Sequence, residues 1–574
     1  MLTCLLEPYT QYVTISTGWL YHQQAEKLCC GLCLRYLSAM TIRPSSSRGL
    51  ACLRLKPSQA CRSYSLISKA SRDADAGSGR PKKQKQRVVI LGSGWAGYGL
   101  ARTLDPDKFE RIVVSPRSHF VFTPLLASTA VGTLEFRAVV EPVRRLGVTF
   151  HQGWADDVDF DRRVVRVEAN VGDDAAARTA RRFLAPSSAA ATTATAQQQP
   201  PAEQQRGPMV EVPYDKLVVA VGAYTQTFGI EGVSEHAHFL RDVGDARRIR
   251  LRVLSLFERC AALPPDAETR DLLHFTIVGG GPTGIEFAAE LHDLVHEDLT
   301  HIYPTLTPLV RITVYDVAPA VLPMFDRELA GYATELFARR GIDVRTRHHL
   351  TGIRAAGPGE AGAALGGLRL RIEEHGDGEV GTGMVVWSTG LMQNPVVGKL
   401  LAKELRVLPD SSSSSSSSGS SSSNSSTTAR LRSDAKSGGI VTDAHQRAQV
   451  EGADGTGRVL DDVFVIGDCA VSEADPTLPR TAQVASQQAV HLAKALNRGT
   501  VGERAFAFRN WGTMAYLGGW RAIHQSSADE LKGWAAWVLW RTAYLTYSMS
   551  VRNKIVVPFY WFVSWVFGRD ITRF

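Results

Sequence analysis

The body of this chain has almost no cysteine. Six of the eight cysteines lie before residue 62, and only Cys260 and Cys469 lie beyond it, far apart in the sequence. The body therefore offers no closely spaced cysteine pair. This excludes a disulfide-rich scaffold and redox chemistry through a C-x-x-C motif.

Long apolar runs are missing as well. No stretch approaches the ~18–20 uncharged apolar residues that a membrane-spanning helix needs, which excludes a polytopic membrane protein. With 44% hydrophobic and 21% charged residues, the chain has the composition of a globular protein rather than a disordered one. Its 574 residues are enough for two or three domains.

Acidic residues are scarce in the first 87 residues, which carry 14 Lys/Arg, 4 Asp/Glu and hence a net charge of +10. No acid occurs between Lys27 and Arg72, and serine is frequent there, which is typical of a mitochondrial transit peptide. A disordered basic tail is the alternative. Residues 88–510 carry a net charge of −6 and the last 64 residues a net charge of +4. The whole-chain charge of +8 therefore gives no support for a broad basic surface that binds nucleic acid.

Two low-complexity segments interrupt the patterned sequence. Residues 171–208 are rich in Ala, Thr and Gln, and residues 411–428 are almost pure serine. Neither can bury a core, so we expect both to be disordered insertions within folded domains.

A strand pattern at 87–91 leads into the glycine-rich turn Gly92-Ser93-Gly94-Trp95-Ala96-Gly97 and then into a helical run. This is the strand, G-x-G-x-x-G, helix arrangement that binds a dinucleotide diphosphate at a helix N-terminus. The contacts are predicted from Gly92, Ser93, Gly94, Ala96 and Gly97. The next strand ends in Ser115-Pro116-Arg117, where an acidic residue for an NAD ribose is usual, so a standard NAD site is not expected here.

A second copy follows at 272–284. The strand LLHFTIV leads into Gly279-Gly280-Gly281-Pro282-Thr283-Gly284, and the next strand ends at Asp316. That carboxylate suits the ribose hydroxyls of NADH and repels the 2′-phosphate of NADPH. We expect Gly279, Gly281, Thr283, Gly284 and Asp316 to bind NADH.

Three further segments, each a strand followed by glycine, indicate which of the two motifs binds which cofactor. The strand 463–466 delivers Gly467 and Asp468, as in two-domain flavoproteins in which the aspartate contacts the FAD ribityl chain. The strands before Gly222 and Gly390 are typical of the segments that return the chain past FAD and NADH respectively. The order of these landmarks predicts an α/β fold with two Rossmann-like domains, the first holding FAD non-covalently.

At this point the chain resembles a known family, the type II NADH dehydrogenases, over about residues 86–574. The resemblance rests on SPRSHFVFTPLLASTAVGTLEFRAVVEPVR (115–144), GGGPTGIEFAAEL (279–291), VFVIGDCA (463–470), LPRTAQVASQQAVHLAKAL (478–496) and WGTMAYLGGWRAI (511–523). It implies that NADH reduces FAD, that the flavin passes two electrons to ubiquinone without proton pumping, and that Pro116 and Arg117 lie at the FAD site. It implies no metal.

The resemblance also assigns candidate catalytic residues. Ala482, Gln483 and Gln487 match the family's A-Q-x-x-x-Q quinone motif, and the two glutamines share one helical face at i, i+4. A solvated helix face is the alternative. Glu286 lies in the first turn after Gly284, where the family places a glutamate near the flavin; stabilisation of the helix start is the other interpretation.

The C-terminal region holds seven of the eleven tryptophans, at 511, 520, 534, 537, 540, 561 and 565. Residues 555–568 are uncharged but too few to span a bilayer. Aromatic residues flanked by Lys and Arg predict an amphipathic region that attaches to one membrane face. A buried core helix or a homodimer contact is the alternative, and both can coexist with attachment.

These observations predict a mitochondrial inner-membrane enzyme, with the matrix face favoured because no spanning segment precedes Arg87. The different-class alternative is an FAD- and NADH-binding signalling protein of the apoptosis-inducing-factor kind. The expected organisation is a leader (1–85), an FAD-binding domain in two parts (86–271 and 393–503), an NADH-binding domain (272–392) and a membrane-anchoring domain (504–574).

Overall fold

The computed structural model describes residues 85–170, 207–407, 427–452, 457–527, 529–548 and 550–573. All of them belong to one compact unit, Lys82–Phe574. The predicted leader lies outside the described residues except for Lys85. The two predicted insertions also lie outside them, except for residues 207–208 and 427–428.

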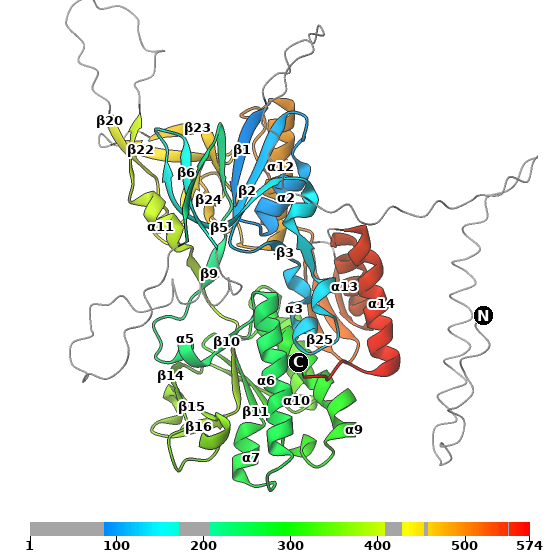
Figure 1. Cartoon of the computed structure of the whole chain (residues 1–574). Coiled ribbons are helices and arrows are strands. Elements are labelled where there is room, and N and C mark those ends of the chain that lie inside the picture. Colours follow the sequence, from blue (N-terminus) through cyan, green and yellow to red (C-terminus); the bar gives the residue numbers. More distant parts are fainter. Residues whose placement is uncertain are drawn as a thin grey trace, which may run out of the picture. The chain divides into compact units, whose positions relative to one another are not determined.

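A twelve-stranded sheet joins the first part of the described chain to residues 404–472, with the order β19-β20-β22-β23-β8-β1-β2-β5-β6-β7 (Figure 1). Beside this path, β21 pairs with β22, and β24 pairs with β21. Its centre, β23-β8-β1-β2-β5, is parallel. The strands are β1 (Gln86–Leu91), β2 (Phe109–Ser115), β5 (Thr149–Asp159), β6 (Val164–Ala169), β7 (Met209–Pro213), β8 (Lys216–Val219), β19 (Glu404–Val407), β20 (Thr427–Leu431), β21 (Ile440–Thr442), β22 (Arg447–Gly452), β23 (Gly457–Val465) and β24 (Ala470–Ser472).

Residues 88–91 of β1 are buried on both faces, which explains their unbroken apolar sequence. Val88 and Ile90 pack into the core beneath the helices α2 (Trp95–Thr103) and α12 (Ala482–Arg498), whereas Val89 and Leu91 join the core on the other face. The two helices pack on each other, and a side chain at Gly99 would lie 3.3 Å from Ala489 Cβ. Thr481 caps the start of α12.

A second sheet is fully parallel, with the order β10-β17-β11-β12-β13. An antiparallel sheet of β14, β15 and β16 follows in the chain. The strands are β10 (His238–Phe239), β11 (His274–Val278), β12 (Arg311–Asp316), β13 (Ile342–Thr346), β14 (Leu350–Ala355), β15 (Leu368–Ile372), β16 (Glu379–Thr382) and β17 (Met384–Trp387). Because β10 pairs with β17, the second sheet draws on residues before the expected boundary at 272.

Helices connect and cover these sheets. The longer ones are α6 (Val243–Cys260), α8 (Pro282–Asp293), continued by the π-helix η5 (Leu294–Leu299), and α10 (Arg327–Arg339); the shorter ones are α3 (Leu126–Ala130), α5 (Val233–His236), α7 (Ala267–Leu272), α9 (Thr300–Ile302) and α11 (Pro395–Leu401). A small hairpin pairs β3 (His119–Val121) with β4 (Val140–Pro142).

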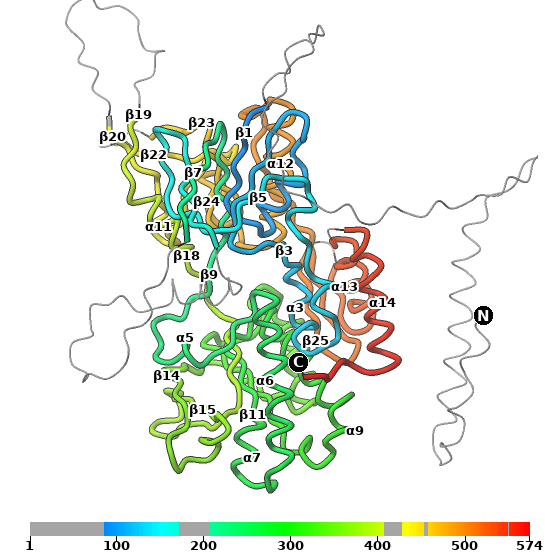
Figure 2. The backbone as a smooth tube through the Cα atoms, viewed as in Figure 1, coloured from blue at the N-terminus to red at the C-terminus, as the bar shows by residue number. Residues whose placement is uncertain are grey.

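The chain passes between the two large sheets twice, at strands that pair with each other. β9 (Ala223–Thr225) leads from the first sheet to the second, and β18 (Leu391–Gln393) leads back; the two are antiparallel. The tube view shows both strands between the two sheets (Figure 2). The architecture is thus the predicted pair of Rossmann-like units, with the second inserted in the first.

The C-terminal region consists of a three-stranded sheet and two helices packed on each other: β25 (Thr513–Gly518), β26 (Arg521–Gln525), β27 (Glu530–Gly533), α13 (Trp534–Tyr547) and α14 (Val551–Phe567). Strand β25 packs on α8 of the second sheet. Among the described residues, none of the helices is both long enough and apolar enough to cross a membrane.

Candidate active site

The two glycine-rich turns have the same backbone geometry. Gly92 has φ +113° and donates its N–H to Val114 O at 2.8 Å; Gly279 has φ +112° and donates to Tyr315 O at 2.8 Å. Both conformations lie in the region that favours glycine. Each turn therefore leaves its strand sharply and starts a helix at the carboxyl edge of a parallel sheet.

The last glycine of each motif allows the helix to touch the turn. A Cβ on Gly97 would lie 2.1 Å from Gly92 O, and one on Gly284 would lie 2.0 Å from Gly279 O. By contrast, a Cβ on Gly94 or Gly281 would meet nothing within 4 Å. The space beside the N-terminal caps of α2 and α8 is therefore open, as the binding of a diphosphate at a helix N-terminus requires.

A cavity of about 640 Å³ extends along the first turn. The predicted FAD residues that line it are Gly92, Ser93, Gly94, Ala96, Pro116, Arg117, Gly222, Gly467 and Asp468. Gly97 does not line it, which agrees with its packing role. Three residues predicted for other tasks also line this cavity: Thr283, Glu286 and Ala482.

The polar groups around the cavity fit FAD. Burial raises the pKa of Asp468, although Arg241 and Arg480 lie near it. In the described part of the chain, the Asp468 carboxylate accepts no hydrogen bond from a side chain or backbone group. A buried acceptor of this kind suits the hydroxyl groups of a ribityl chain, and the open N-terminus of α2 suits the diphosphate.

Several cavity residues were not among the predicted site residues. Arg241, Arg480, Met514 and Tyr544 line the cavity from segments far apart in the chain. Trp95 also lines it and donates its Nε1 hydrogen to Thr123 Oγ1 at 3.0 Å. Trp95 lies within the first glycine turn, and Arg480 and Met514 lie within the segments 478–496 and 511–523, whereas Arg241 and Tyr544 reach the cavity only through packing between elements.

The second glycine turn is held by the residue predicted to bind the NADH ribose. Asp316 Oδ2 accepts the Gly280 N–H at 2.5 Å, and Oδ1 accepts the Ala318 N–H at 2.7 Å. Gly390, with φ +72°, returns the chain beside this turn, and a Cβ on it would lie 2.8 Å from Gln226 Cβ. The predicted NADH residues Gly279, Gly281, Gly284, Asp316 and Gly390 therefore meet at the carboxyl edge of the second sheet.

Glu286 is buried at the wall of the cavity beside the first turn. Its Oε1 accepts the backbone N–H of Tyr516 at 3.1 Å and the indole N–H of Trp540 at 3.2 Å. Burial raises the pKa of Glu286 to about 8. The carboxyl group is therefore largely protonated at neutral pH and able to give up a proton.

Two further acidic residues on the same face of α8, Glu290 and Asp293, take part in hydrogen bonds that connect α8 to the C-terminal region. Tyr516 Oη donates to Asp293 at 2.8 Å, and Thr133 Oγ1 donates to Glu290 at 2.9 Å. Arg569, which follows α14, reaches back to Thr133 at 2.9 Å and to Asp298 at 2.6 Å. The C-terminal region is thus fastened to α8 by buried polar contacts.

Gln483 and Gln487 face the segment 509–512 with both ends of their amides. Gln483 donates to Gly512 O at 2.7 Å and accepts from Trp511 N at 3.2 Å. Gln487 donates to Arg509 O at 2.8 Å and accepts from Arg509 N at 3.0 Å. The two side chains join α12 to the start of the C-terminal region.

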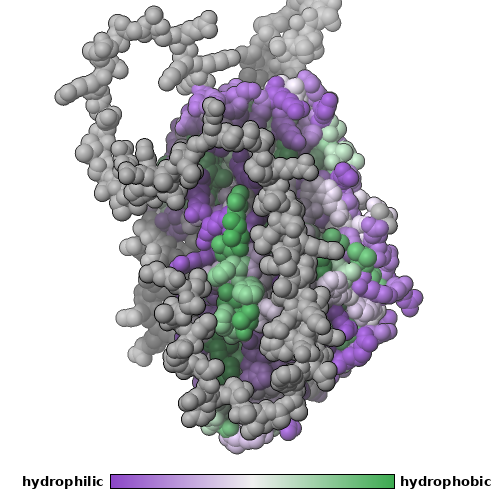
Figure 3. Space-filling model, turned by 90° about the vertical axis from the view of Figure 1, so that its right-hand side faces the viewer, coloured by the Kyte–Doolittle hydropathy of each residue, from purple (hydrophilic) through white to green (hydrophobic). Residues whose placement is uncertain are grey.

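Helix α14 buries one stripe and exposes another. Asn553, Val557 and Trp561 are buried, whereas the exposed apolar residues are Val551, Ile555, Phe559, Phe562, Trp565, Val566 and Phe567. Arg552 and Lys554 are exposed at the start of the helix. Figure 3, in which the side carrying α14 in Figure 1 faces the viewer, shows apolar surface in a band along this face.

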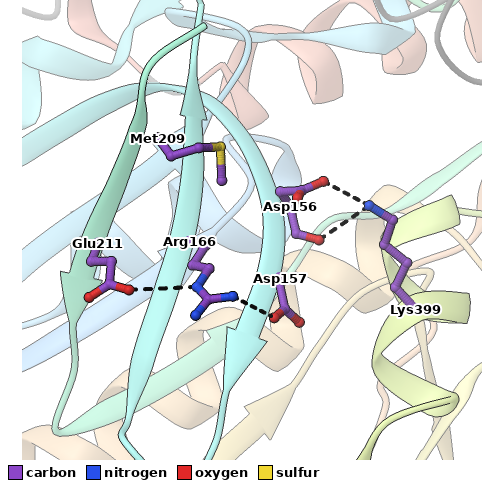
Figure 4. A pocket seen from close by; sticks show the side chains of 6 residues that line it. All are labelled: Asp156, Asp157, Arg166, Met209, Glu211 and Lys399. Carbon is purple, nitrogen blue, oxygen red and sulfur yellow. Dashed lines mark hydrogen bonds and ion pairs between the residues drawn. The ribbon is translucent and has the colours of Figure 1, made fainter. Parts of the chain in front are cut away.

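A second hollow lies on the outer strands of the first sheet, lined by Asp156, Asp157, Arg166, Met209, Glu211 and Lys399 (Figure 4). Its charges compensate one another: Lys399 pairs with Asp156 at 2.7 Å, and Arg166 lies 3.6 Å from Glu211. Figure 4 shows these side chains directed at each other across the hollow. None of the predicted site residues lines it.

Comparison with family models gives two matches. The model described as "Pyridine nucleotide-disulphide oxidoreductase" matches residues 86–407, and the model described as "NDH2 C-terminal domain" matches residues 511–570. The first covers both glycine turns and Glu286. The second covers β25, Trp540 and all of α14.

Two relatives and one solved structure cover most of the chain. A probable NADH dehydrogenase of Dictyostelium discoideum is 34% identical over 502 residues, which is 86% of this chain and 92% of the relative. The external alternative NAD(P)H-ubiquinone oxidoreductase B3 of Arabidopsis thaliana mitochondria is 31% identical over 577 residues, or 86% of this chain and 91% of the relative. The structure of NDH2 from Plasmodium falciparum in complex with NADH matches the fold with a TM-score of 0.65 at 20% identity, over 85% of this chain and 100% of that one.

Proposed function

The chain belongs to the type II NADH dehydrogenase family, and on that basis we propose that it is an FAD-dependent NADH:ubiquinone oxidoreductase that pumps no protons. The observation that carries the proposal is the pair of glycine turns, one beside a cavity suited to FAD and one beside Asp316. Glu286, on the helix that starts at the second turn, reaches the cavity of the first.

When bound, FAD supplies the redox chemistry, taking hydride from NADH and giving two electrons to the quinone. The turn Gly92–Gly97 binds the FAD diphosphate with Ser93 and Ala96, Asp468 binds the ribityl chain, and Pro116, Arg117, Gly222 and Gly467 shape the cavity. The turn Gly279–Gly284 binds the NADH diphosphate with Thr283, Asp316 binds the adenosine ribose, and Gly390 lets the chain pass the nicotinamide.

Quinone reduction consumes protons, and Glu286 is the group placed to supply one. Its carboxyl lies at the cavity wall, and burial keeps it protonated to about pH 8. We place the quinone head group at the edge of the cavity beside Ala482. Gln483 and Gln487 hold the segment 509–512 next to this edge through hydrogen bonds from their side-chain amides.

The cysteines agree with direct transfer from the flavin to the quinone. Within the described residues, Cys260 and Cys469 are both free and buried, and burial raises the pKa of Cys469 to about 12. A thiol with such a pKa is a poor nucleophile. We infer that Cys260 and Cys469 do not form the redox-active pair on which disulfide reductases depend.

A steady-state assay tests the proposal. Purified FAD-loaded protein should oxidise NADH at a rate that depends on a short-chain ubiquinone, with stoichiometric quinol formed. The signalling alternative of the apoptosis-inducing-factor kind predicts NADH binding without quinone-dependent turnover. Its weakness is that the C-terminal region matches the NDH2 model.

For the location, we propose a mitochondrial protein held on the inner membrane from one side by the exposed apolar stripe of α14 and the cations Arg552 and Lys554. Replacing Phe559, Phe562 and Trp565 by serine should release the protein from vesicles containing anionic lipid, whereas replacing the exposed Glu335 of α10 by serine should not. Retention of the triple variant would contradict attachment through α14. Protease protection in intact mitochondria tests the expected matrix face.

We further propose that the described units divide the work as expected from the sequence. The first sheet with α12 is the FAD-binding domain, and the second sheet is the NADH-binding domain. The C-terminal region is the membrane-facing domain, and a homodimer would form through it. Analytical ultracentrifugation of the detergent-solubilised protein tests the dimer.

A further inference from the structure

Glu286 draws its polar support from the C-terminal region. The two N–H groups that reach its Oε1 belong to Tyr516 on β25 and Trp540 on α13. Only proline would remove the backbone N–H of Tyr516, and it would disrupt β25, whereas the indole N–H of Trp540 can be removed by an aromatic substitution. Substitution of Trp540 can therefore remove one of the two hydrogen bonds that Glu286 accepts.

The indole of Trp540 is held in one orientation. Only 3% of the residue is exposed, and its ring packs on Tyr516 with centroids 5.4 Å apart. On the other side it meets Tyr544 edge-on at 4.9 Å, and Tyr544 itself lines the flavin cavity. Because a buried indole N–H needs an acceptor, the carboxyl of Glu286 and the indole fix each other.

The titratable groups that face Glu286 are acidic or phenolic, so no cation competes with Trp540 for the Glu286 carboxyl. Glu290 approaches from its own helix, Tyr544 from α13 and Tyr516 from β25. Among the described residues Glu286 forms no ion pair. The nearby cations Arg541 and Arg569 have other partners: Arg541 lies over the rings of Trp537 and Trp561, 4.6 and 4.2 Å from their centroids, and Arg569 pairs with Asp298.

We propose that Trp540 is a positioning residue of the oxidoreductase: its indole N–H holds the Glu286 carboxyl at the wall of the flavin cavity. The proposal rests on the proposed function, in which Glu286 supplies a proton. It makes the C-terminal region part of the active site as well as a membrane-facing element. The outer face of the same helix exposes Trp534 and Val538.

Loss of the indole N–H has a defined effect on the titration of Glu286. Burial raises the pKa of this carboxyl, and the two N–H groups oppose the rise because they stabilise the ionised form. A variant without the indole N–H should therefore bind its proton more tightly. The carboxyl should then ionise at higher pH than in the parent protein.

The test compares Trp540→Phe with Trp537→Phe in the full-length, FAD-loaded protein. Phenylalanine at 540 keeps an aromatic ring between Tyr516 and Tyr544 but has no donor. Trp537 lies on the same helix and stacks on Trp520 at 5.1 Å without a bond to Glu286. Incorporation of the benzothienyl analogue of tryptophan at 540 keeps the ring size and removes the N–H, and serves if Trp540→Phe does not fold.

Two readouts are measured. The first is the infrared band of the protonated carboxyl in the resting protein, assigned by its loss in Glu286→Gln and titrated with pH. The second is the pH at which quinone-dependent kcat declines. For Trp540→Phe and the analogue we expect both to move up by about one pH unit, with KM for NADH unchanged and Trp537→Phe like the parent.

An infrared titration of Trp540→Phe that coincides with the parent's would overturn the proposal, as would an equal shift in Trp537→Phe. Since the infrared titration needs no turnover, it separates this proposal from the proposed function. A protein that shows the shift but reduces no quinone would contradict the function while retaining the Trp540–Glu286 link.

Discussion

Gly92 and Gly279 occupy equivalent turns in two different sheets, with φ +113° and +112° and with matching N–H bonds to the strand next to their own. The two turns therefore share one geometry, and we propose a different ligand for each. Because each turn depends on its own helix glycine, one site can be damaged while the other is kept.

Gly284→Ala should abolish reduction by NADH while leaving FAD bound. The new Cβ would lie 2.0 Å from Gly279 O, so the second turn must open. Overpacking of this kind costs ~1–3 kcal/mol and displaces the helix start. The flavin absorbance of the purified variant and its rate of bleaching by NADH measure the two effects, with Gly97→Ala as the matched variant that should lose flavin. Normal bleaching in Gly284→Ala would contradict the assignment of the second turn.

Asp316→Asn should shift the preference from NADH toward NADPH. The asparagine keeps a carbonyl acceptor for one of the two N–H groups that hold the turn, but it removes the charge that repels a 2′-phosphate. A partly screened charge pair near a protein surface is worth ~1–2 kcal/mol, so the ratio of kcat/KM for NADH over NADPH should fall about tenfold. Asp343→Asn on the adjacent strand β13 should leave the ratio unchanged, and an unchanged ratio in Asp316→Asn would exclude its role in selectivity.

Glu286→Gln should alter how stability depends on pH. The pKa of Glu286 is raised to about 8, above its ordinary value of 4.5, so the folded protein binds this proton more tightly than the unfolded chain. That stabilisation is present below pH 4.5 and is lost as the pH rises through about 8. Relative to the parent, Glu286→Gln should gain stability on the order of a few kcal/mol between pH 5 and pH 9. Thermal unfolding at several pH values measures this, with the exposed Glu335→Gln as the control; parallel curves for parent and Glu286→Gln would refute a buried acid.

Gln487 variants should expose the segment 509–512 to protease. The amide makes two hydrogen bonds to the backbone of Arg509, each worth about 1 kcal/mol. Gln487→Glu keeps the acceptor and loses the donor, whereas Gln487→Leu loses both, so tryptic cleavage after Arg509 should rise from parent to Glu to Leu. If the amide instead binds the quinone, KM for quinone should rise with no change in cleavage.

Local sequence patterns predicted the two glycine-rich turns because the conformation of each turn depends on residues that are close together in the sequence. The strand, the glycines and the helix lie within a dozen positions, and Gly97 and Gly284 are required by contacts inside the motif itself. Asp468 could be found in the same way, from its place at the end of a buried strand. The fold class followed from two such motifs and the strands that return past them.

Contacts between distant elements were out of reach of the sequence. Arg241 and Tyr544 line the cavity beside the first turn, although the sequence around each of them contains no cofactor-binding motif. Strand β10 has only two residues and therefore no periodicity, so the sequence could not show that it belongs to the second sheet. The spacing of Gln483 and Gln487 predicted their shared face, but only the fold shows that the segment 509–512 lies against it.

The most direct test of the account is an anaerobic sequence of two additions to the purified, FAD-loaded protein. NADH in stoichiometric amount should bleach the flavin absorbance, and a short-chain ubiquinone added next should restore it with formation of an equal amount of quinol. Flavin that bleaches with NADH but stays reduced in the presence of ubiquinone would contradict the proposed NADH:ubiquinone oxidoreductase.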